Sequence, residues 1–206
     1  MSLTTSGKGT SRKNPKPGLT KGVCVALYDL GNQSNPYQDG KYTPQVLIEW
    51  DLPDQTMEYN GEVVPMRQCK FYTASIYDGS GQGTESALHK DLVSWRGRRF
   101  TEAELEAFNL RNILGHHCML NIVEKGEGKV KVDGVMAPAV PEDKKTEGLV
   151  FWDMDNPAEN WDLVPDWVRR IISKAEQFPD IAVYLPDEPE PEPAPTVDAT
   201  SEDCPF

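Results

Sequence analysis

The chain has 206 residues, 26% of them charged, and a formal net charge of −12 at pH 7. This length suits one domain with extensions, and no stretch approaches the roughly 20 apolar residues that a membrane-spanning helix needs. We therefore expect a soluble, cytoplasmic protein. Four scattered cysteines are typical of free thiols in a reducing compartment. They are Cys24, Cys69, Cys118 and Cys204.

The charge is unevenly distributed along the chain. Residues 1–22 carry five basic residues and no acid, whereas residues 181–206 carry seven acids and no base, which leaves −10 for the residues between them. Residues 1–20 are rich in Ser, Thr, Gly, Lys and Pro, so we expect a disordered basic arm. An acidic middle argues against a nucleic-acid ligand unless its basic residues are clustered.

Five segments have the β-branched and aromatic composition of strands, with turn residues between them. Helical spacing of apolar residues appears between the third and fourth, where Gly97 ends one predicted helix and a capping box, Thr101 to Glu104, begins another over 102–109. The expected strands are 23–28, 45–52, 66–77, 118–123 and 129–136. A loop at 53–61 is expected to join the second and third strands.

Five strands with helices inserted late is the element order of an OB-fold, the small barrel that binds oligonucleotides. The fold class expected is thus mainly β, an OB-fold-like barrel over residues 21–180 with short inserted helices and a C-terminal helix. A β-sandwich or an SH3-like barrel would give the same list of elements.

Prolines bracket the C-terminal helix, expected over 166–178. We expect it to pack on the barrel through Trp167, Ile171 and Ala175; the alternative is a helix that swings free to bind a partner. Residues 181–206, rich in Pro and Glu from Pro186, are expected to form a disordered acidic tail.

The last six residues, 201–206, place acids before a terminal Phe. A terminal Phe joins a ring to an α-carboxylate, so an apolar pocket with a basic rim can bind both; burying the ring contributes about 1.5–3 kcal/mol. This end resembles the acidic tail of bacterial and phage single-stranded-DNA-binding proteins. The resemblance implies that replication or recombination enzymes bind the tip, through Glu202, Asp203, Pro205 and Phe206. The sequence departs from that pattern at Cys204 and in its Pro-Glu spacer.

A second resemblance lies in the middle of the chain. Residues 91–101, DLVSWRGRRFT, and 114–121, LGHHCMLN, are similar to a small phage family linked to DNA replication and recombination. The similarity spans roughly residues 21–140. It implies a phage protein that acts in the host cytoplasm, and it brings no nucleophile or metal cluster with it.

Single strands are bound by aromatic rings that stack on bases and by basic groups that follow the phosphates. The expected stacking rings are Trp50, Tyr72 and Tyr77. The expected phosphate contacts are Lys41, Arg67, Lys70, Arg96, Arg98 and Arg99, the last three gathered in one turn. Each of these aromatic residues also suits a core position.

Enzyme functions are less well supported by the sequence. The glycines of 79–83 lack the Lys-Ser/Thr of a P-loop, and the adjacent His116 and His117 would point to opposite sides of a strand. The acids Asp153, Asp155, Glu159 and Asp162 suggest a Mg²⁺-dependent nuclease only weakly. We expect no catalytic residue, metal or cofactor.

The function expected from the sequence is therefore sequence-tolerant binding of single-stranded DNA. The acidic tail is expected to compete with DNA for the basic groove that the phosphate-contact residues form. The alternatives are a recombination mediator or adaptor without enzyme activity and, less favoured, the nuclease. The sequence is compatible with a homo-oligomer and indicates no membrane partner.

Overall fold

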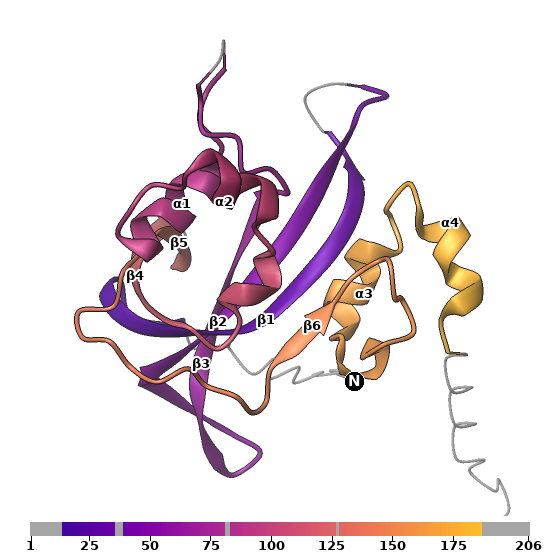
Figure 1. The fold of residues 1–206 in the computed structure, drawn as a ribbon. Helices are drawn as coiled ribbons and strands as arrows, with labels where there is room; N and C mark the ends of the chain where they lie inside the picture. Colours follow the sequence, from indigo (N-terminus) through magenta and orange to yellow (C-terminus); the bar gives the residue numbers. More distant parts are fainter. Residues whose placement is uncertain (1–13, 36–38, 81–82, 127, 187–206) are drawn as a thin grey trace, which may run out of the picture.

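A computed structural model describes residues 14–35, 39–80, 83–126 and 128–186, and this part of the chain is mainly β (Figure 1). Its strands form one sheet in the order β3-β2-β1-β4-β5, in which neighbours are antiparallel, and β6 joins β1 in parallel. The strands are β1 (Gly18–Ser34), β2 (Tyr42–Tyr59), β3 (Glu62–Thr73), β4 (His117–Gly126), β5 (Lys129–Met136) and β6 (Val150–Trp152). The expected mainly β fold is confirmed, and β6 is a strand that the sequence did not indicate.

The helices are short and lie in two groups. In Figure 1, α1 and α2 lie near β4 and β5, whereas α3 lies beside β6 and α4 lies beyond α3. The first group comprises α1 (Ala87–Arg96), α2 (Glu102–Ala107) and the 3₁₀ turn η1 (Leu110–Ile113). The second comprises η2 (Trp161–Leu163), α3 (Asp166–Ile172), α4 (Phe178–Ile181) and η3 (Ala182–Tyr184).

The central strand, β1, explains the longest apolar run of the chain. One of its edges pairs with β2 along most of its length, and the other edge pairs first with β4 and then with β6. Cys24 and Leu27 point into the core between the sheet and α1, whereas Ala26 and Tyr28 point into a second core on the opposite face. Residues 22–28 are all buried, and Asp29 after them is half-buried. Because both faces of this part of β1 are covered, its sequence is continuously apolar and does not alternate with polar residues. β1 begins at Gly18, inside the expected arm, and residues 1–13 lie outside the described part.

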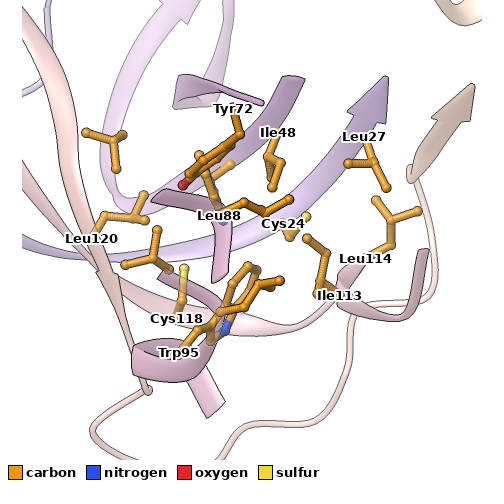
Figure 2. Packing of buried hydrophobic residues seen from close by; sticks show 14 of the residues in the cluster. Cys24, Leu27, Ile48, Tyr72, Leu88, Trp95, Ile113, Leu114, Cys118 and Leu120 are labelled. Carbon is orange, nitrogen blue, oxygen red and sulfur yellow. The ribbon is translucent and has the colours of Figure 1, made fainter. Parts of the chain in front are cut away.

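The first core fills the space between the sheet and α1 (Figure 2). Leu88, Leu92 and Trp95 of α1 contribute to it at the helical spacing expected from the sequence. The Trp95 ring packs 6.3 Å from that of Trp50, and its indole N–H donates to the carbonyl of His117 at 2.8 Å. The expected end of α1 and the expected start of α2 are confirmed, since Gly97 ends α1 in the left-handed region and the capping box precedes α2; α2 ends at Ala107 and not at the expected residue 109.

The second core lies on the face of β1 and β2 opposite the first core. There, residues of β6, η2 and α3 pack against the two strands. Val168 and Ile172 of α3 are fully buried there, and Ala175 just after the helix is 5% exposed. The expected packing of this helix on the sheet is confirmed, but the helix ends at Ile172 and not at the expected residue 178, and Trp167 was placed in the interface wrongly. It remains 37% exposed, because the buried face of α3 is the one that carries Val168 and Ile172.

The β2–β3 connection is a tight hairpin and not the expected loop over 53–61. β2 continues to Tyr59, and Asn60 and Gly61 form the turn with φ of 52° and 83°. Asn-Gly is the pair that a two-residue type I′ turn favours, because both central residues need positive φ. A register shift between Leu52 and Thr56 absorbs the extra residues.

Side chains bridge the two ends of the sheet, β3 and β5. The ammonium group of Lys70 on β3 donates to the carbonyl of Asp133 on β5 at 2.8 Å and to the carboxylate of Asp91 on α1 at 2.7 Å. The Tyr72 hydroxyl donates to the same Asp91 oxygen at 2.7 Å. Lys70 thus ties β3, β5 and α1 together.

Candidate functional site

The outer face of β2 and β3 carries the strongest candidate site. Along β3 the side chains of Arg67, Cys69 and Phe71 follow one another at the two-residue period of one strand face. Their partners on β2 are Asp51, Glu49 and Leu47 in turn. The second core covers Leu47, and the rest of this face borders a cavity of about 520 Å³.

The cavity, called the β2–β3 cavity below, has a charged floor and a partly apolar wall. Its lining comprises Asn14, Pro15, Glu49, Met57, Tyr59, Met66, Arg67, Gln68, Cys69 and Trp167. Trp167 reaches it from α3, and Tyr59 reaches it from the end of the hairpin arm. Two aromatic rings from separate elements therefore border one hollow.

Three aromatic side chains on or beside this face are exposed to solvent. Tyr59 is 61% exposed, Phe71 47% and Trp167 37%. Phe71 is four residues along β3 from Arg67, which corresponds to roughly 13 Å. The surface that these three rings form with Arg67 is called the aromatic face. An exposed ring beside a guanidinium suits stacking on a planar ligand that also carries negative charge.

Beneath the aromatic face lies a buried acidic pair. Arg67 Nε donates to Asp51 at 2.9 Å and Arg67 Nη1 lies 3.7 Å from Glu49, while Lys145 Nζ lies 3.4 Å from Asp51. Burial raises the pKa of Glu49, although the Arg67 charge and the Tyr28 hydrogen bond oppose the rise. The pKa of Arg67 is raised because Asp51 and Glu49 outweigh the effect of its own burial. Arg67 thus stays protonated, and its positive charge is partly balanced by the two acids.

Two of the expected stacking rings are in the core, which corrects the sequence-based interpretation. Trp50 is fully buried and Tyr72 is 3% exposed, so neither offers a face to a base. They alternate with the outward residues of β2 and β3 and therefore point into the first core. Tyr77, beyond the end of β3, is 39% exposed and keeps a face in contact with solvent.

The turn of three arginines is formed as expected, but an acid neutralises most of it. Glu104 accepts from Arg96 at 2.8 Å and from both terminal nitrogens of Arg98, at 2.6 and 3.0 Å. These bonds, led by the Arg98 pair, hold the pKa of Glu104 well below its usual range. Arg96 also stacks on the Phe100 ring at 4.0 Å. Arg99 is exposed and makes no ion pair within the described residues.

The remaining basic candidates differ from one another. Lys70 is held by Asp91, with 20% of its side chain exposed, so it acts as a structural bridge. Lys41 is exposed at the start of the β2 region and has no ion pair among the described residues. The structure therefore brings Arg96, Arg98 and Arg99 together, and leaves Lys41 and Arg67 on separate parts of the surface.

Tyr59, Phe71 and Trp167 were missed in the sequence. A signal for two of them was present: Phe71 follows Arg67 at an even spacing in a strand, and Asn60-Gly61 marks a hairpin that places Tyr59 beside the turn. Trp167 carried no such signal, because the face of a seven-residue helix that is buried depends on its tertiary contacts.

Several expectations concern residues that the structure does not describe or groups that it does not assemble. Glu202, Asp203, Pro205 and Phe206 lie outside the described residues. Within the described ranges no three His, Cys, Asp or Glu residues are arranged to hold a metal ion. No helix among them is long and apolar enough to cross a membrane.

The chain was compared with protein-family models, with curated proteins and with solved structures. None of the three comparisons finds a match. The interpretation of the site therefore depends on its residues and on the resemblances in the sequence.

Proposed function

We propose that this chain binds single-stranded DNA with little sequence preference, as a component without enzyme activity in phage DNA replication or recombination. The observation that carries the proposal is the aromatic face, on which Tyr59, Phe71 and Trp167 are exposed around Arg67. Every base has a π-face, so such rings bind single strands of any sequence, with about 1–3 kcal/mol from each stacked base.

The arrangement of the strands supports the proposal. An OB-fold is a five-stranded, partly open Greek-key barrel with helical material between the third and fourth strands. The order β3-β2-β1-β4-β5, the position of α1 and the Lys70 bridge from β3 to β5 fit an OB-like barrel. In such barrels the face of strands 2 and 3 binds oligonucleotides, and here that face carries Phe71 and Arg67.

The acidic end of the chain completes the proposal. By its resemblance to the tails of single-stranded-DNA-binding proteins, residues 202–206 recruit replication or recombination enzymes. Because this end is acidic, it also competes with DNA for basic groups. Removing residues 186–206 is expected to tighten DNA binding at low salt, and unchanged affinity would contradict the competition.

A titration of the full chain with a fluorescent dT 20-mer, with duplex of the same length as control, tests DNA binding. We expect binding to the single strand alone, weakened by salt with a log-log slope of about −0.7 for each phosphate neutralised. Phe71→Ala is expected to weaken it about 5- to 150-fold, the loss of one stacked base. Tyr184→Ala, which removes a ring that is 68% exposed on η3, is the matched control and should leave affinity unchanged.

An adaptor that binds only proteins is the second candidate. It is favoured by the ion pairs, because four of the six basic candidates, Arg67, Lys70, Arg96 and Arg98, are held by acids. An adaptor would bind neither the dT strand nor the duplex, even at low salt. That result would replace the first proposal with the second.

A further inference from the structure

The floor of the β2–β3 cavity holds a carboxylate whose hydrogen-bonding capacity is largely unused. Glu49 is 4% exposed, and its two polar contacts are long, the Tyr28 hydroxyl at 3.4 Å and Arg67 Nη1 at 3.7 Å. Both reach Oε2, and within the described part of the chain Oε1 has no hydrogen-bond partner. Glu49 lines the cavity, and Oε1 is not one of the fully buried atoms without a partner, so this oxygen faces the open space and can accept from a ligand that supplies donors there.

The cavity has the dimensions and walls of a site for a small planar ligand. Its volume of about 520 Å³ lies in the usual range for such sites. Trp167 and Tyr59 supply rings at its border, and Met57 and Met66 supply adaptable apolar surface. The ligand must therefore combine a flat apolar body with N–H groups along one edge.

Among the DNA bases, guanine has the matching edge. It presents two adjacent donors, N1–H and the 2-amino group, which can meet both oxygens of one carboxylate. Adenine and cytosine place an acceptor beside their amino group, and thymine flanks its one N–H with two carbonyls. Each of those acceptors would face a carboxylate oxygen, which disfavours the other three bases.

We propose that the β2–β3 cavity is a guanine subsite, in which Glu49 accepts from the Watson–Crick edge of one base while Trp167 and Tyr59 flank its ring. The subsite rests on the proposed binding of single-stranded DNA and adds to it one preferred base within an otherwise sequence-tolerant interface. Arg67 is half exposed and bound to Asp51. Its positive charge offsets the acids at the floor, so the cavity does not repel the phosphate of a nucleotide.

Trp167 supplies the signal for a direct test. It is 37% exposed, whereas the other tryptophans, Trp50, Trp95, Trp152 and Trp161, are at most 8% exposed. The full chain, excited at the red edge of tryptophan absorption, is titrated with dGMP, dIMP and dTMP. We expect quenching by dGMP with a Kd on the order of tenfold below that of dIMP, which lacks the 2-amino group, and weaker binding of dTMP.

Two variants localise the preference to the floor of the cavity. Glu49→Gln replaces one acceptor with an amide donor at constant size and should remove the difference between dGMP and dIMP. Glu58→Gln makes the same change in charge at an exposed position of β2 and should retain it. If Glu49→Gln does not fold, as judged by circular dichroism, Glu49→Asp serves in its place, because shortening the carboxylate should also weaken the preference.

The outcomes separate the guanine subsite from the proposed function. A second titration compares dT 12-mers with a central dG, a central dI or dT alone. Equal affinity for all three, with equal binding of the mononucleotides, would overturn the subsite and leave single-strand binding intact. Selective binding of dGMP without binding of any 12-mer would keep the subsite and overturn the function. Stronger quenching by N-acetyl-arginine amide than by dGMP would overturn the subsite too, since it would assign the cavity to a guanidinium of a protein partner.

Discussion

Asp91 is expected to be the most costly single carboxylate to remove from the described part of the chain. Its Oδ2 accepts at 2.7 Å from both the Lys70 ammonium and the Tyr72 hydroxyl, and the two charged side chains are only 20% and 13% exposed. Removing one partner of a buried ion pair costs about 3–5 kcal/mol. Lys70 keeps its bond to the carbonyl of Asp133, so Asp91→Ala should cost about 3 kcal/mol of unfolding free energy.

Urea unfolding followed by circular dichroism measures this loss. With a slope of about 2 kcal/mol/M, the midpoint of Asp91→Ala should fall by about 1.5 M. Tyr72→Phe should cost about 1.5 kcal/mol in the natural chain, as for a hydrogen bond to a charged group. In the Asp91→Ala background it should cost almost nothing, because its acceptor is already gone. A loss below 1 kcal/mol for Asp91→Ala, or additive effects in the double variant, would refute the proposed role of this carboxylate as the shared acceptor.

Three further predictions concern stability. Both Gly115 and Gly97 have positive φ, but only at Gly115 would an added Cβ meet the backbone of Lys145. Gly115→Ala should therefore cost more unfolding free energy than Gly97→Ala, and equal losses of unfolding free energy, measured in urea, would contradict this. Glu104 binds two arginines, which lower its pKa in the folded state, so its contribution to folding stability is present above the unfolded pKa of about 4.3 and is lost as pH falls further. The difference in unfolding free energy between the natural chain and Glu104→Gln should therefore be constant above about pH 5 and shrink below it. A difference that is unchanged at pH 3 would count against the ion pairs. Ile172→Ala should cost about 2–5 kcal/mol, because the side chain is fully buried in the second core, and a loss under 1 kcal/mol would mean that α3 packs weakly.

Local chemistry made much of the fold predictable. The capping box of α2, the helical spacing of Leu88, Leu92 and Trp95, and the composition of the strands each act within a few residues, and each has the predicted result. β6 was missed because its three residues pair with a strand more than a hundred positions earlier in the chain. No local pattern reports such a pairing.

The candidate site was harder to predict, because exposure depends on tertiary packing. Trp50 and Phe71 look alike in the sequence, yet the two-residue alternation points one into the core and the other to solvent. The partners of basic residues are equally remote, since Asp51 and Asp91 lie 16 and 21 residues from Arg67 and Lys70. Residue type therefore indicated a class of ligand, whereas the structure selected the aromatic face.

The most direct test of the central proposal is tryptophan fluorescence of the full chain during titration with a dT 20-mer at low salt. Because Trp167 is the exposed tryptophan among the described residues, binding at the aromatic face predicts saturable quenching that is reversed by salt. Trp167→Phe should lose the quenching and keep most of the affinity measured by anisotropy, since Phe can also stack. Binding without quenching in the natural chain, or quenching that persists in Trp167→Phe, would contradict the assignment of the aromatic face as the DNA-binding surface.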